Sequence, residues 1–209
     1  MANRRYENSL IREGFPNVVG LDEAGRGPLA GPLVVAAVIF PKSYSNSEIN
    51  DSKQLSDKKR RELEIEIKKL ALFYHVEEVS LEDIDRYNIY QASKIGMIRC
   101  LDHLAGKYDA ILTDAMPLEN YTCPMISLIH GDALSLSIAA ASILAKVHRD
   151  NIMLEFDKIY PQYDFKKNKG YGTKEHLQAL EKYGVTPIHR KTYEPIATML
   201  KPNLFNYNK

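Results

Sequence analysis

Two short apolar segments on either side of a glycine-rich turn constrain the fold of this chain most. Residues 17–21 and residues 32–41, the second a β-branched run bounded by prolines, have the length and composition of buried strands. Between them lie Asp22, Glu23 and the turn Gly25-Arg26-Gly27. Because a strand and not a helix follows the turn, the sequence predicts a β-hairpin with two adjacent carboxylates at the end of its first strand.

The acidic pair and the turn together predict a site for an anionic ligand. Neighbouring side chains of a strand point to opposite faces, so Asp22 and Glu23 reach one ligand only where the strand ends or a divalent cation bridges them. Gly25 and Gly27 leave room for backbone N–H groups to approach a phosphate or a sugar, and Arg26 adds charge-assisted hydrogen bonds. The segment therefore has the character of an active-site edge.

Three other interpretations of this segment compete with that one. A surface acidic pair beside a turn is common, so a solvated turn stays open on the segment alone. Residues 25–30 match the dinucleotide-binding pattern G-x-G-x-x-G/A, but that pattern needs a helix after the turn. A kinase glycine-rich loop does lie between strands, yet His148-Arg149-Asp150 sits in a helical pattern and the chain has no Asp-Phe-Gly.

Composition is that of an ordinary globular protein, and 209 residues suit one domain. Twenty-eight Lys and Arg against 27 Asp and Glu give a net charge of +1, so any affinity for nucleic acid must come from a local pattern.

The longest apolar run, residues 33–40, is too short to span a membrane, and no secretory segment is predicted. Cys100 and Cys123 form no metal motif; a disulfide between them stays open, and a reduced, cytoplasmic setting is the simpler expectation.

Alternating strand-like and helix-like periods predict an α/β or α+β fold. The expected strands are residues 18–22, 32–40, 71–79, 108–114 and 125–129. The expected helices are residues 56–70 capped by Ser56, a helix ending near Gly106, residues 132–160 and residues 173–183 capped by Thr173. Seven apolar residues of the long helix are expected to be buried: Leu134, Ile138, Ala141, Ala145, Ile152, Phe156 and Ile159. Residues 201–209 have no helical period and are expected to be disordered.

Polar residues at helical spacing predict a second functional stripe on the long helix. Asp132, Ser135, Ser142, Lys146 and Arg149 would share one face, for which a solvated surface is the alternative.

The segment after this helix, residues 163–173, interleaves aromatic residues and lysines around two glycines. This pattern suits a loop along a phosphate backbone, although lysine-rich loops are often only solvated.

Four acids stand at the ends of predicted elements: Asp22, Glu23, Asp114 and Asp132. Carboxylates that cluster usually avoid mutual repulsion by binding cations. Since no His or Cys accompanies them in these motifs, the sequence favours Mg²⁺ or Mn²⁺ over Zn²⁺.

The chain resembles the ribonuclease HII family, the type 2 ribonucleases H, over nearly its whole length. The matching segments follow the family's order: residues 20–32, 51–56, 112–115, 131–150, 168–173 and 189–190. The resemblance implies a ribonuclease H-like α/β fold, with a mixed central sheet flanked by helices in residues 1–160 and a helical, basic C-terminal portion, residues 161–209, beside the substrate groove of the same domain. It also implies an endonuclease that hydrolyses the RNA strand of RNA/DNA hybrids and cuts 5′ of single ribonucleotides in duplex DNA.

Residue roles carried over from the family divide the site. The four acids match the catalytic metal ligands, Gly25-Arg26-Gly27 matches the turn that reads the ribose 2′-hydroxyl, and Tyr171 matches the tyrosine that stacks near the RNA-to-DNA junction. The turn's arginine and Tyr171 favour this family over the sister ribonuclease HIII. Candidates for positioning phosphates are Lys53, Ser142, Lys146 and Arg149, whereas Asp150 is expected to form a structural ion pair.

The implied chemistry needs no protein nucleophile. Two Mg²⁺ or Mn²⁺ ions roughly 4 Å apart would activate the attacking water and stabilise the leaving 3′ oxygen, which leaves 5′-phosphate and 3′-hydroxyl ends. The expected partner is an RNA/DNA hybrid or duplex DNA containing ribonucleotides, acted on by a monomer. Two alternatives stay open: a non-catalytic duplex-binding protein, and another metal nuclease of the same fold.

Two positions depart from the family's usual pattern. His130 stands where lysine is common, and Ala115-Met116-Pro117 replaces a glycine-containing segment. Neither departure removes a predicted metal ligand.

Overall fold

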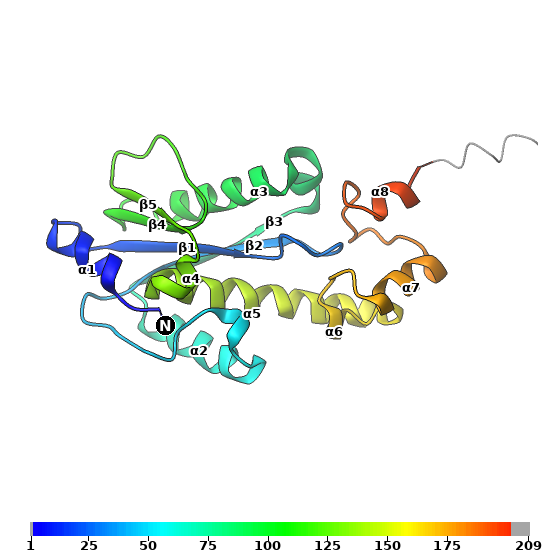
Figure 1. Cartoon of the computed structure of the whole chain (residues 1–209), viewed down its shortest axis with the longest axis horizontal. Coiled ribbons are helices and arrows are strands. Elements are labelled where there is room, and N and C mark those ends of the chain that lie inside the picture. The colour runs from blue at the N-terminus through cyan, green and yellow to red at the C-terminus, as the bar shows by residue number, and fades with distance from the viewer. Residues whose placement is uncertain (1, 202–209) are drawn as a thin grey trace, which may run out of the picture.

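A mixed five-stranded sheet forms the centre of the molecule (Figure 1). The structure, a computed structural model, describes residues 2–201. In the order β3-β2-β1-β4-β5, the strands are Phe73–Val79, Leu33–Ile39, Val18–Ala24, Ala110–Asp114 and Met125–Leu128. β1 pairs antiparallel with β2 and parallel with β4, which confirms the predicted hairpin and the α/β class. All five predicted strands are present.

Helices cover both faces of the sheet (Figure 1). α5 (Leu136–Ile159) crosses β1 and β2 on one face beside α2 (Asp57–Leu70), and α3 (Leu81–His103) covers β2 and β3 on the other. Every residue of β2 is buried, because alternate side chains enter the α5 core and the α3 core. On β1, a Cβ at Gly20 would lie 2.4 Å from the Ser137 carbonyl carbon, so glycine permits the close approach of α5.

The remaining helices are short. They are α1 (Arg5–Arg12), α4 (Gly131–Leu134), α6 (Phe165–Asn168), α7 (Lys174–Tyr183) and α8 (Ile196–Met199), with 3₁₀ turns at Ser52–Gln54 and Pro161–Tyr163. α6, α7 and α8 gather at one end of α5 (Figure 1). Their core, which contains Tyr163, Phe165 and Leu180, also includes Leu29 of the β1–β2 turn and Met153 of α5. The C-terminal portion is thus packed directly onto the predicted active-site turn.

The predicted helix over residues 132–160 is wrong in its first part. Ser135 is extended (φ −110°, ψ 131°) and separates α4 from α5, which its side chain caps through the N–H of Ile138. The buried carboxylate of Glu7 accepts hydrogen bonds from Ser135 Oγ and the Ser137 N–H, so a segment far away in sequence stabilises this break. Leu134 and Ile159, expected to be buried, are 39% and 63% exposed.

Two further expectations concern the ends of the chain and the membrane. The tail, predicted to be disordered, lies outside the described residues from 202 onward. Among the helices of residues 2–201, none has both the length and the apolar character needed to cross a bilayer.

Candidate active site

Three carboxylates meet where β1 and β4 end. Asp22 lies on β1, Asp114 is the last residue of the parallel neighbour β4, and Asp132 is the second residue of α4. One oxygen from each can be chosen so that all three lie within 4.8 Å of one another. Asp22 and Asp132 are each only 4% exposed. Parallel strands bring their carboxyl ends to one edge of a sheet, which explains how Asp22 and Asp114 converge here. Asp132 joins them from α4, whose Gly131 N–H donates to Asp114.

Glu23, the fourth predicted acid, lies beside this cluster but is not part of the three-oxygen set. β1 stays paired with β2 through Ala24, so strand alternation still applies at Asp22 and Glu23. Glu23 Oε1 accepts a hydrogen bond from Arg26 at 3.3 Å, and its buried Oε2 has no hydrogen-bond partner among the described residues. A buried carboxylate oxygen without a partner fits a group that awaits a cation.

The pKa values of the clustered acids also indicate a site for a cation. Burial raises the pKa of Asp22 well above its usual value, and the charges of Glu23 and Asp114 add to this effect. Burial likewise raises the pKa of Glu23 to about 7, against the opposing influence of Arg26. The pKa of Asp114 is also raised by burial, although the Gly131 N–H favours its ionised form. A divalent cation would relieve this crowding of like charges, so the residues fit a metal site.

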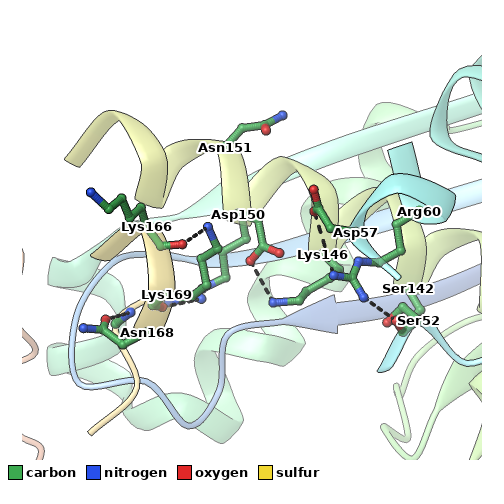
Figure 2. A network of polar contacts seen from close by, with 12 residues as sticks. Ser52, Asp57, Arg60, Ser142, Lys146, Asp150, Asn151, Lys166, Asn168 and Lys169 are labelled. Carbon is green, nitrogen blue, oxygen red and sulfur yellow. Dashed lines mark hydrogen bonds and ion pairs between the residues drawn. The ribbon is translucent and has the colours of Figure 1, made fainter. Parts of the chain in front are cut away.

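The cluster opens into a cleft of about 330 Å³. The lining includes every residue that the sequence assigned to the site except Asp132, which belongs to the carboxylate cluster itself. Lys53 contributes an ammonium 3.4 Å from Asp132 Oδ2. Ser52, which the sequence did not single out, also lines the cleft, and its hydroxyl lies 2.9 Å from that of Ser142 (Figure 2).

Lys146 and Asp150 form an ion pair of 2.7 Å on successive turns of α5 (Figure 2). This confirms the structural role predicted for Asp150, whose side chain is 3% exposed. The Lys146 side chain is 23% exposed and reaches the lining of the cleft. Lys146 therefore pairs with Asp150 on the helix and also lies in the wall of the cleft.

The two glycines of the predicted 2′-hydroxyl turn have different surroundings. Gly25 has φ +102°, and a Cβ there would lie 2.2 Å from Nε of Arg149. At Gly27 a Cβ would meet only Cε1 of Tyr171, at 3.6 Å. The space at Gly25 is thus filled by the protein, whereas Gly27 and the half-exposed Tyr171 border the cleft together.

Arg149 was expected to position phosphates, but its donors face main-chain carbonyls. The residue is 1% exposed. Nε donates to Pro32 O, Nη1 to Lys169 O and Nη2 to Ala30 O. This side chain therefore links α5 to the β1–β2 turn and to the basic loop before Tyr171.

Arg190 is the residue whose position the sequence did not predict. It is fully buried and donates hydrogen bonds to the carbonyls of Gly25, Arg26 and Gly31. In the sequence, residues 189–190 are one of the segments that match the family, but the match assigns Arg190 no role in the site. Nothing in its neighbourhood along the chain indicates that it lies beneath a turn more than 150 residues away.

Both departures from the family's pattern have left-handed backbone conformations. Ala115 has φ 46° and His130 has φ 58°. A φ in this range favours glycine, so Ala115 occupies a position for which the glycine-containing version is sterically better suited.

Similarity to known proteins agrees with this geometry. The family model described as Ribonuclease HII matches residues 19–195. Ribonuclease HII from Acholeplasma laidlawii is 51% identical over 199 residues (95% of this chain, 98% of the relative), and that from Enterococcus faecalis is 52% identical over 196 residues (94% and 76%). The crystal structure of ribonuclease H2 from Pyrococcus horikoshii is similar with a TM-score of 0.75 at 26% identity, over 88% of this chain and 96% of that one. The chain belongs to the ribonuclease HII family.

Proposed function

We propose that this protein is a ribonuclease H that hydrolyses the RNA strand of RNA/DNA hybrids and cuts 5′ of single ribonucleotides embedded in duplex DNA. The observation that carries the proposal is the position of the Asp22, Asp114 and Asp132 cluster in one cleft with the Gly25-Arg26-Gly27 turn and Tyr171. The first group supplies hydrolysis and the second supplies recognition of a ribose.

Asp22, Asp114 and Asp132, with Glu23 beside them, would hold Mg²⁺ or Mn²⁺ through oxygen atoms alone. Bound there, such an ion would supply a water of lowered pKa and positive charge for the scissile phosphate and the leaving 3′ oxygen. The unpartnered Oε2 of Glu23 and the raised pKa values of the buried acids support this assignment.

The chain's own residues bind and orient the substrate. Arg26 and Gly27 present backbone N–H groups at the edge of the cleft, and a 2′-hydroxyl can accept hydrogen bonds from such groups. Tyr171 is 46% exposed, so its ring is free to stack on a sugar or base. Lys53 and Lys146 supply positive charge for the phosphates on either side.

One cleavage assay tests the proposal. The protein is incubated with Mg²⁺ or Mn²⁺ and with three substrates: a duplex that holds one ribonucleotide, the same duplex entirely of DNA, and a four-way DNA junction. We expect cleavage of the first alone, 5′ of the ribonucleotide, with 5′-phosphate and 3′-hydroxyl ends. Cleavage of a DNA-only substrate would indicate another nuclease of this fold, and binding without any cleavage would indicate a non-catalytic duplex-binding protein.

A further inference from the structure

The peptide groups of the Gly25-Arg26-Gly27 turn are held from below by one buried side chain. Arg190 Nη2 donates to Gly25 O and Nη1 donates to Arg26 O at 2.9 Å. Its Nε and Nη2 also donate to Gly31 O at 3.1 and 2.9 Å. A single planar guanidinium therefore fixes both ends of the turn that joins β1 to β2.

Tyr193 completes this contact. Its hydroxyl donates to Arg26 O at 2.8 Å and accepts a hydrogen bond of 3.2 Å from Arg190 Nη1. The guanidinium carbon of Arg190 lies 5.1 Å from the centre of the Tyr193 ring. The carbonyl of Arg26 thus receives two donors, one charged and one neutral.

The direction of these carbonyls determines the direction of the N–H groups that follow them. In a trans peptide the C=O and the next N–H point in opposite directions, and the only cis peptide within residues 2–201 is Glu194-Pro195. Since the carbonyls of Gly25 and Arg26 point to Arg190, the N–H groups of Arg26 and Gly27 point away from it. Neither N–H donates to another group in the described part of the chain. They are left for a ligand in the cleft that these residues line.

Arg190 is a fully buried cation, which is unusual for an arginine. Burial lowers the pKa values of Arg190 and of its neighbour Arg149, the latter to about 10. An arginine guanidinium in a protein nevertheless carries its charge at neutral pH. Neither arginine forms an ion pair with a carboxylate among residues 2–201. Buried cations are costly unless their donors are satisfied, and here backbone carbonyls satisfy them. The segment that carries Arg190 is itself anchored, because Asp85 accepts from the N–H groups of Lys191 and Thr192.

We propose that Arg190, assisted by the Tyr193 hydroxyl, is a positioning residue that aims the Arg26 and Gly27 N–H groups at the substrate and so sets the preference for a ribose 2′-hydroxyl. This inference rests on the proposed function of the turn and adds the residue that orients it. It assigns ribose selectivity partly to a side chain that no substrate touches.

Two variants and a matched control test this role. Arg190→Lys keeps the charge but cannot span the carbonyls of the turn. Tyr193→Phe removes one hydroxyl and preserves the ring, so it keeps the test decisive even if Arg190→Lys fails to fold. Tyr183→Phe is the control, because that tyrosine is half exposed at the end of α7 and does not contact the turn.

The measured quantity is the ratio of affinities for a duplex with one ribonucleotide and for the same duplex entirely of DNA. Both are determined with Ca²⁺, which takes the same oxygen ligands as Mg²⁺, and each substrate is checked to be intact afterwards. Single-turnover cleavage with Mg²⁺ is followed in parallel. A merely structural role would lower both affinities together and leave their ratio unchanged.

We expect the ratio to fall roughly fivefold in Tyr193→Phe, as the loss of one hydrogen bond predicts, and at least roughly tenfold in Arg190→Lys. Affinity for the DNA duplex should stay within about twofold of the unmodified protein, and Tyr183→Phe should change neither quantity. An unchanged ratio in Tyr193→Phe, or an equal loss of affinity for both duplexes, would overturn the inference. If the unmodified protein itself shows no preference for the ribonucleotide, the proposed function fails instead.

Discussion

Asp114 Oδ1 accepts a hydrogen bond of 2.7 Å from the N–H of Gly131, and this bond joins the end of β4 to the short helix that carries Asp132. One carboxylate oxygen is therefore occupied in holding a second carboxylate in place. The other is free to serve the cluster. In the proposed site Asp114 would thus have both a structural and a chemical function, which a single substitution can separate.

Asp114→Asn keeps an oxygen acceptor for Gly131 but removes one negative charge from the crowded site. We expect cleavage to be abolished while duplex binding is retained. In the unmodified protein, Mn²⁺ at a hundred times its dissociation constant should raise the free energy of unfolding by about 3 kcal/mol. The chelator EDTA should reverse this stabilisation. Thermal melts with and without Mn²⁺ measure the effect, and Glu119→Gln, an exposed acid, is the control. Equal stabilisation of Asp114→Asn and the unmodified protein would contradict the assigned ligand set.

A buried histidine pair predicts how stability depends on pH. Nε2 of His176 and Nε2 of His189 lie 3.0 Å apart, with both residues at most 1% exposed. Burial lowers the pKa values of both, that of His189 to about 4, with the neighbouring His176 as a further cause. Because the unfolded chain then binds protons near pH 6.5 and the folded one does not, the free energy of unfolding should fall between pH 6.5 and 4, by on the order of 3 kcal/mol for His189.

The raised pKa values of the active-site acids have the opposite effect, since the folded protein takes up protons there first as the pH falls. Urea denaturation at several pH values should therefore be compared between the unmodified protein and His189→Gln. The difference between the two curves isolates the histidine, and His148→Gln, at a partly exposed position beside Glu78, is the control. Parallel curves for His189→Gln and the unmodified protein would show that the pair does not titrate as described.

The turn glycines should respond differently to an added methyl group. Gly25→Ala would place Cβ against Arg149 at a positive φ, so we expect a loss of stability on the order of 3 kcal/mol. Gly27→Ala meets only an ordinary contact with Tyr171, so folding should be preserved while kcat/KM for a ribonucleotide-containing duplex falls. Melting temperature and steady-state kinetics distinguish the two. A stable Gly25→Ala protein would contradict the close packing of Arg149.

Elements with a strong local signal were predictable from the sequence. Ser56 and Thr173 cap α2 and α7 as expected, because capping depends only on residues within one turn. The hairpin also followed from local composition, and so did the carboxylates near the end of β1 and at the end of β4. Each of these features depends on interactions between residues that are close together in the sequence.

Features that depend on distant partners could not be predicted. The break at Ser135 is stabilised by Glu7, which is distant in the sequence. Residues on either side of the break, such as Leu134 and Ser142, keep the same spacing along the chain with or without it, so the spacing could not reveal it. Arg149 lies in a segment that matches the family, and the sequence predicts a phosphate contact for it. The sequence does not reveal that its donors are taken up by the carbonyls of Ala30 and Pro32. Family resemblance located these residues, whereas only the structure shows what each one contacts.

Lys146 and Asp150 provide a test of whether the cleft binds phosphate through this lysine. Lys146→Gln removes a cation that lines the cleft, so we expect a higher KM and a slope of log affinity against log salt concentration that is smaller by about 1. Asp150→Asn keeps the lysine charge and a hydrogen-bond acceptor in nearly the same volume, so the slope should stay unchanged although some stability is lost with the ion pair. Duplex affinity between low and moderate salt, measured by fluorescence anisotropy, decides the matter. An unaltered slope in Lys146→Gln would mean that its charge serves Asp150 alone and that phosphate contacts come from other residues such as Lys53.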